Sequence, residues 1–167
     1  ARDAQGRAYG VAPDGGSIEL GLSDSFLVIR PGAVLDASGA YAEIDGSAGG
    51  AAGVLARPLA LAGAGGSIGL HSYVGMVIDG TLVARAGGAG AAGGSLTLEM
   101  ANRRYLAGVE NLSDAVQTMH DITLTQHYRP GGLADGLAPG QADAGLKYGA
   151  AVLSADRVTA GGFDALT

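Results

Sequence analysis

The residues of this sequence that could do chemistry begin with a glycine-rich segment. Gly88, Gly90 and Gly93 have the G-x-G-x-x-G spacing of a dinucleotide-binding turn. Such a turn follows a strand and opens a helix, because the helix N-terminus holds the pyrophosphate. Here residues 95–99 (SLTLE) alternate apolar and polar side chains, as a strand does. We therefore predict a corner between two strands, and neither a nucleotide site nor any other cofactor site.

Acidic side chains are the next candidates, because a glycosidase needs two carboxyl groups held about 5 to 10 Å apart. The sequence offers Asp79 with Glu99, or Asp121 beside His120, and neither pair belongs to a local motif. Most of the other acids fall in turns, where Asp side chains bond to their own backbone. We predict no catalytic residues, and we keep a polysaccharide-processing enzyme as the alternative.

Metal ligands are sparse in this chain. It contains no Cys, which excludes thiolate metal sites and disulfides. The three histidines, His71, His120 and His127, lack the short spacing of a local metal motif. The sequence therefore predicts no metal site, and it places His71 on the surface or at a corner of the fold.

The bulk composition limits the class of protein. A chain of 167 residues is long enough for one domain, and 47% hydrophobic residues against 16% charged ones are enough to form a core. The net charge is −6 and the basic residues are scattered apart from Arg103-Arg104, which argues against a nucleic-acid partner. No apolar run reaches the ~18 residues that span a bilayer, so we expect no membrane insertion.

The elements that must position these residues are repeated. The template G-G-S-[IL]-x-L occurs at residues 15–20, 65–70 and 93–98, and a degenerate fourth copy begins at Gly161. After each of the first two copies come an apolar segment, a Gly turn and a second apolar segment. The period of about 22 to 28 residues lies in the range of solenoid coils. We predict an all-β chain built as one coiled parallel sheet, of roughly six coils stacked about 4.8 Å apart.

Three details of this pattern remain open or weak. A gapless overlay of the first two copies puts Asp36 at the position of Ala84, which we expect to point inward. Either the pairing shifts by one residue there, or Asp36 satisfies a turn backbone. The only helical signal lies at residues 111–116 and is short. Residues 150–159 (AAVLSADRVT) resume the pattern of a strand.

Two long segments interrupt the repeat, at residues 101–117 and 127–147. Long loops usually lie across a scaffold or carry its function. Arg and Tyr suit contact surfaces, since they combine planar area with hydrogen bonding. The candidate partner-contact residues are therefore Arg103, Arg104, Tyr105, His127, Tyr128 and Arg129. The alternative is that both segments merely cover a face of the scaffold.

The order of these motifs resembles the filamentous-haemagglutinin-like large exoproteins of Gram-negative bacteria. The resemblance rests on the G-G-S-I-x-L repeats and on residues 32–40 (GAVLDASGA), 79–98 (DGTLVARAGGAGAAGGSLTL) and 153–167 (LSADRVTAGGFDALT). It implies a right-handed parallel β-helix, a solenoid with two long loop excursions, spanning residues 1–167 as a single segment. The Asn-Pro motif of the family's secretion domain is absent, which indicates an internal segment of the rod.

The resemblance also implies a function. The segment is expected to be a non-enzymatic structural or adhesive part of a protein that is secreted to the bacterial cell surface. The parent chain would pass through an outer-membrane β-barrel transporter, and its partner would be a host or bacterial surface receptor or a glycan. A non-catalytic carbohydrate-binding module is a further alternative, although the chain has no Trp and only 5% aromatic residues for stacking.

Overall fold

The computed structural model describes residues 10–45, 58–100, 105–106, 109–110 and 120–167. Most of its elements are short strands, joined by turns that are rich in Gly. The elements are β1 (Ser17–Leu22), β2 (Leu27–Ile29), β3 (Val34–Asp36), β4 (Tyr41–Asp45), β5 (Pro58–Ala62), β6 (Ser67–Ser72), β7 (Met76–Ile78), β8 (Thr81–Val83), β9 (Gly94–Glu99), β10 (Tyr105–Leu106), β11 (Val109–Glu110), β12 (Asp121–Thr125), β13 (Ala150–Ser154), α1 (Ala155–Gly161) and β14 (Phe163–Leu166).

The repeated copies lie side by side as parallel strands. β1 pairs with β6 and β6 with β9, so that Ser17, Ser67 and Ser95 occupy one row. β2 pairs with β7 and β3 with β8 in the same direction. The chain from β1 to β3 therefore rests strand for strand on the chain from β6 to β8. The prediction of a mostly β chain with parallel strands is confirmed.

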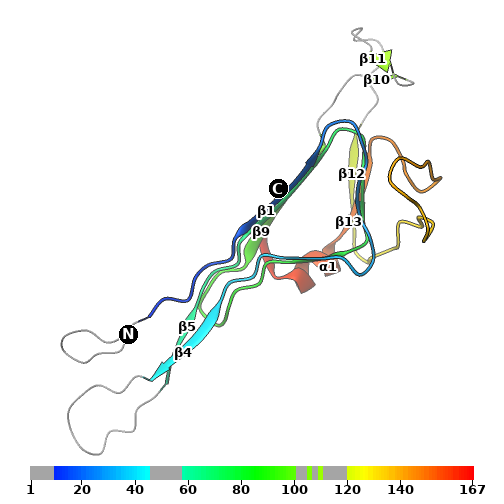
Figure 1. Ribbon diagram of the computed structural model, residues 1–167. Helices are drawn as coiled ribbons and strands as arrows, with labels where there is room; N and C mark the ends of the chain where they lie inside the picture. Colours follow the sequence, from blue (N-terminus) through cyan, green and yellow to red (C-terminus); the bar gives the residue numbers. More distant parts are fainter. Residues whose placement is uncertain (1–9, 46–57, 101–104, 107–108, 111–119) are drawn as a thin grey trace, which may run out of the picture.

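The strands enclose a triangular outline (Figure 1). The first side holds β1, β6, β9 and β14 in that order. The second side holds β2 and β7, with β12 and β13 next to them, and the third holds β3 and β8, against which α1 packs. β9 follows the glycine-rich segment at residues 88–93 directly, so the predicted strand stands where a nucleotide-binding turn would need a helix.

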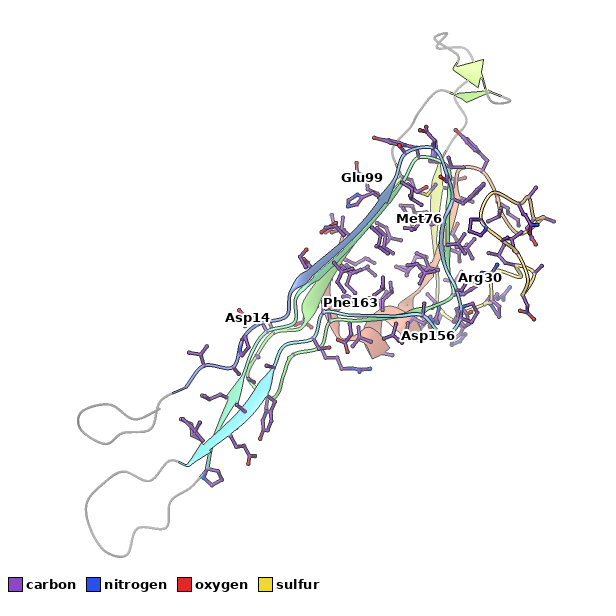
Figure 2. All side chains as sticks on the ribbon, viewed as in Figure 1. Asp14, Arg30, Met76, Glu99, Asp156 and Phe163 are labelled. Atoms are coloured by element: carbon purple, nitrogen blue, oxygen red, sulfur yellow. The ribbon has the colours of Figure 1, made fainter. Side chains whose placement is uncertain are left out.

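The apolar core lies inside this triangle. Leu70 and Leu96 are 0% exposed and Ile68 is 1% exposed, while Ser67 and His71 alternate with them on the outer face. Burial of each such aliphatic side chain contributes about 1.5–3 kcal/mol. Met76 of the second side and Phe163 of β14 on the first side contribute to the same interior (Figure 2). Apolar residues of neighbouring copies thus stack in rows, which is why the template must repeat in register.

The first Gly of the paired glycines permits close approach of two backbones. A Cβ atom on Gly15 would lie 1.9 Å from the carbonyl oxygen of Ala37, and one on Gly65 would lie 2.0 Å from that of Ala84. Neither Gly has a positive φ. Gly32 and Gly90, in turns, do have a positive φ, whereas the repeated pair is required to be Gly because there is no space for a side chain.

Both explanations that the sequence leaves open for Asp36 apply: the strand pairing shifts by one residue, and the carboxylate binds a turn backbone. The pairing of β3 with β8 puts Asp36 opposite Val83, one residue away from the gapless overlay. The carboxylate is exposed and accepts a hydrogen bond from the backbone N–H of Ser38 at 2.9 Å. Hydrogen bonds from the side chain and the backbone of Ser38 hold the pKa of Asp36 below its ordinary value. Ala37, which follows, takes the buried position.

The expectation of an all-β chain is wrong at one place. β13 ends at Ser154, and residues 155–161 form helix α1 where the sequence pattern predicted a strand up to residue 159. The helix has an acid, Asp156, in its first turn and ends at Gly162, whose φ of 76° is left-handed. Ser154 at the N-cap and the Gly at the end are ordinary helix boundaries, but a helix of seven residues is too short to show a clear helical period. The short helical signal at residues 111–116 lies outside the described residues.

The degenerate fourth copy does form a strand of the first side, but out of register with the template. β14 pairs with β9 so that Phe163 lies opposite Gly94 and Ala165 opposite Ser95. Between them Asp164 accepts a hydrogen bond from the N–H of Gly93 at 2.6 Å. This carboxylate bond accompanies the irregularity, which has the form of a bulge.

Two features extend the chain beyond the triangle. The antiparallel hairpin of β4 and β5 projects from one corner, and residues 126–149, which contain no helix or strand, lie outside the second side (Figure 1). Because they and the segment after β9 use much of the chain, the longest described sheet has four strands and not the six expected. β10 and β11 form a small antiparallel pair within the first excursion.

Within the described residues, no helix combines the length and the hydropathy needed to cross a bilayer.

Substitution of adjacent glycines tests the close approach of the backbones. Gly15→Ala should lower the free energy of unfolding by about 1–3 kcal/mol, because its methyl group would collide with the Ala37 carbonyl. Gly16→Ala is the matched control, since nothing lies within 4 Å of a Cβ atom there. Urea denaturation of both variants measures the difference, and equal stability of the two variants would contradict the predicted packing.

Candidate functional site

The predicted contact residues are only partly within the described chain. Arg103 and Arg104 lie outside it, and Tyr105 belongs to β10 without a described side chain. The other three open the second excursion: His127, Tyr128 and Arg129. They lie beside a cluster around Asp79, at the corner between the second and third sides. This corner is the best-defined candidate site of the described residues.

Asp79 is a buried carboxylate at the end of β7. Asp79 is only 7% exposed to solvent. Its Oδ1 accepts hydrogen bonds from the Tyr128 hydroxyl at 2.9 Å and from the Gly131 N–H at 2.9 Å, while Oδ2 lies 3.1 Å from the same N–H. Charge-assisted bonds of this kind offset the cost of burying a carboxylate. Asp79 therefore fastens the start of the second excursion to the corner.

Arg157 of α1 completes the cluster from the other side. Its guanidinium donates to the carbonyl oxygens of Ile78 at 3.0 Å and of Asp79 at 2.8 Å. The same group lies 3.8 Å from the centroid of the Tyr128 ring, a cation–π distance. Burial, followed by the bond to Asp79, raises the pKa of the Tyr128 phenol. The phenol is thus neutral and donating under physiological conditions.

This geometry separates the three described contact candidates. Tyr128 is half-buried, and its hydroxyl and one ring face are already used within the molecule. His127 is 83% exposed at its side chain, with Nδ1 3.6 Å from an oxygen of Asp156, and Arg129 is also exposed. The predicted contact residues that are exposed at this corner are therefore His127 and Arg129, whereas Tyr128 mainly supports them.

Arg30, at the end of β2, holds the middle of the second excursion. Its Nη1 donates to the carbonyl oxygens of Ala134 and Asp135 at 3.0 and 3.2 Å, and its Nη2 donates to that of Leu137 at 2.7 Å. Figure 2 shows Arg30 on the outside of the second side, facing the excursion. The excursion is therefore attached to the strands by two side chains, Asp79 near its start and Arg30 in its middle.

The carboxylate pairs considered for catalysis are not brought together. Asp79 lies at the corner after β7, whereas Glu99 ends β9 on the first side, where it contacts His71. Asp121 is exposed on β12. The neighbouring His120 uses Nε2 in a hydrogen bond with the Tyr73 carbonyl at 2.9 Å. Each of these groups has a separate structural environment.

A second charged cluster, on the first side, crosses three parallel strands. His71 Nε2 lies 3.0 Å from Glu19 on β1, and its Nδ1 lies 3.1 Å from Glu99 on β9. Glu99 is directly opposite His71, whereas Glu19 reaches it diagonally across Gly69. A Cβ atom on Gly69 would lie 1.8 Å from the Glu19 carboxylate, so the missing side chain makes room for this reach.

The Glu19–His71–Glu99 row favours protonated imidazole. A neutral ring has one N–H and can donate to only one carboxylate, whereas the imidazolium donates to both. The bond to Glu19 is the largest cause of a raised pKa of His71; burial opposes it, and the bond to Glu99 adds to the rise. The row is not a metal site: no group of three or more suitable side chains in the described chain could hold a metal ion.

Sequence reasoning placed His71 on the surface but missed its partners. Overlay of the copies contains the signal, since His71 and Glu99 both follow the template directly and therefore share a column. Nothing in the sequence marks Arg30 or Arg157, because their acceptors are backbone carbonyls. Asp79 was noted as an acid, and its partner Tyr128 as a contact residue, but not as a pair.

Removal of one hydroxyl tests the cluster at the corner. Tyr128→Phe should lower the free energy of unfolding by about 1–3 kcal/mol, because the buried Asp79 carboxylate loses a donor. Tyr41→Phe is the matched control, since that hydroxyl bonds to Glu43 on an exposed strand, and it should leave stability almost unchanged. Chemical denaturation of both variants gives the comparison. A loss no larger for Tyr128→Phe than for the control would exclude the structural role of this bond.

The His71 row predicts a dependence of stability on pH. Because the folded pKa is raised, the stabilising effect is complete below the unfolded value of about 6.5 and disappears as the pH rises through the folded pKa. The three side chains are 38%, 57% and 63% exposed, so solvent screening limits the effect to below about 1 kcal/mol.

Melting of the protein and of His71→Gln at several pH values measures this effect. The variant should lose more stability at pH about 5.5 than at pH about 8.5, and about 1 M salt should reduce the difference. In a background with both Glu19→Gln and Glu99→Gln, the stability lost on His71→Gln should no longer depend on pH. A penalty for His71→Gln that is constant over this range would show that the charge of His71 does not contribute.

Comparisons with protein-family models, with curated proteins and with solved structures return no match for this chain. The likeness to filamentous-haemagglutinin-like exoproteins is therefore a likeness of short motifs and their order. The function proposed below rests on that likeness together with the stacking and the site geometry of this chain.

Proposed function

We propose that this chain is a rod segment of a secreted bacterial surface exoprotein of filamentous-haemagglutinin type, built as a right-handed parallel β-helix. The observation that carries the proposal is the pairing of β1, β2 and β3 with β6, β7 and β8, in order and in parallel. Each circuit of the chain then rests on the circuit before it. The hand follows from the strong preference of parallel crossover connections for right-handedness.

Such stacking suits a stalk more than a globular enzyme. Every added circuit lengthens the rod by about 4.8 Å and buries the apolar row of its neighbour. The four strands of the first side span three such steps, or about 14 Å. The chain supplies no disulfide that would hinder passage in an unfolded state, since it has no Cys. This fits export of the parent chain through an outer-membrane β-barrel transporter.

The adhesive role is assigned to the excursions. His127 and Arg129 are exposed on a segment that Asp79 and Arg30 hold against the strands, so a partner would meet them in a fixed arrangement. In the first excursion, the sequence adds Arg103, Arg104 and Tyr105 as candidates. The partner is a receptor or a glycan on a host or bacterial surface.

Binding of the purified segment to host cells and to bacterial cells tests the adhesive role. A variant with His127→Ala and Arg129→Ala should bind at least about fivefold more weakly, since an exposed arginine in a contact surface commonly contributes more than 1 kcal/mol. Asp135→Ala, on the same excursion, is the control and should leave binding unchanged. Unaltered binding by the double variant would remove this surface from the proposal.

A parallel assay separates the stalk from the alternative enzyme. The segment is incubated with bacterial and host polysaccharides, and new reducing ends are measured. The proposal predicts no release above that of heat-denatured protein. Release that disappears in Asp79→Asn, with the fold retained by circular dichroism, would instead establish a polysaccharide-processing enzyme.

A further inference from the structure

A cavity of about 330 Å³ lies beside β7, where this strand faces β13 and α1. Its inner wall is apolar and is formed by Met76, Ile78, Leu82, Leu96, Val158 and Phe163. Its mouth lies under the start and the end of the second excursion. Neither the rod nor the contact surface proposed above requires such a cavity, because a stacked solenoid is ordinarily filled by its own side chains.

The cavity arises where the ladder of the second side opens. β7 pairs with β2 and β13 pairs with β12, and no ladder joins β7 to β13 although the two strands are in contact. At one end the Gly149 N–H donates to the Val74 carbonyl at 2.7 Å. At the other end Arg157 occupies the carbonyls of Ile78 and Asp79, which a neighbouring strand would otherwise use. The opening between these two points is therefore supported by specific bonds.

The mouth is cationic in a chain that is acidic overall. Arg129, Lys147 and Arg157 line it against one carboxylate, Asp79, which leaves a formal charge of +2. The Asp79 oxygens accept bonds from Tyr128 and Gly131. The chain as a whole carries −6, and Lys147 is its only lysine. A concentration of positive charge at an apolar cavity selects for a ligand that is anionic at one end.

We propose that this cavity binds a monomeric amphipathic monoanion, a medium-chain carboxylate with its apolar tail inside and its carboxylate at the Arg129–Lys147 mouth. The volume is roughly twice that of the ~150 Å³ apolar cavity that accepts benzene, so it suits a tail of about ten carbon atoms. A saccharide fits poorly, since the inner wall offers few polar partners for its hydroxyl groups. Exposed Arg129 and Lys147 set the orientation of the ligand.

Calorimetric titration of the whole segment with decanoate, below its micelle concentration, tests this site. The proposal predicts saturable binding of one decanoate per chain. Decanol, which has the same tail without charge, should bind at least about tenfold more weakly, which corresponds to one well-placed charge contact. The absence of saturable decanoate binding up to about 1 mM, the weak limit of a useful affinity, would overturn the proposal.

Two variants locate the ligand. Arg129→Gln with Lys147→Gln should weaken decanoate at least about fivefold and leave decanol unchanged. Val158→Phe should fill the inner wall and abolish binding of both probes while the protein still unfolds cooperatively. Arg129→Gln with Lys147→Gln, the mouth variant, changes only exposed side chains. It therefore tests the site even if Val158→Phe prevents folding. Equal affinity of the mouth variant and the unchanged protein for decanoate would place the binding elsewhere and refute the site.

Discussion

The structure depends on one close approach, that of the backbone of each repeated glycine pair to the carbonyl group of an adjacent corner. Gly15 lies against Ala37 and Gly65 against Ala84, at separations that leave no space for a Cβ atom. The contact brings the N–H of Gly66 within 2.8 Å of the Ala37 carbonyl and that of Gly94 within 2.7 Å of the Ala84 carbonyl. These bonds fix where each circuit turns, and hence the register of every strand that follows.

The fixed register in turn positions the charged clusters. Because β1, β6 and β9 are aligned residue for residue, Glu19, His71 and Glu99 meet across three strands that are far apart in the sequence. The β7 corner presents Asp79 to the excursion in the same way. Between β7 and β13 no ladder forms, and Arg157 of α1 binds backbone carbonyls at the end of β7 instead. A cavity with a cationic mouth lies at this opening. Regular stacking thus forms the scaffold, and its interruption forms the candidate binding site.

The sequence predicts the parts of this arrangement that repeat. Three copies of one template are enough to identify parallel strands, their register and the inward rows of Ile68 and Leu70. It does not predict features that occur once. Helix α1 was mistaken for a strand because it has only seven residues and follows β13 directly, and the bulge at Asp164 is accompanied by a single carboxylate bond. Arg30 and Arg157 act on backbone carbonyls over more than 70 residues of sequence separation, and such contacts leave no local pattern.

The most direct test of in-register stacking is disulfide formation in a variant with Ser17→Cys and Ser67→Cys, followed by peptide mapping. The chain has no Cys of its own, and the two hydroxyl oxygens lie 2.9 Å apart on neighbouring strands. Stacking predicts a rapid intramolecular disulfide for this pair. It predicts none for Ser17→Cys with Ser95→Cys, which lie two strands and about 10 Å apart. Failure of the first pair to cross-link, or equal cross-linking of both pairs, would contradict the account.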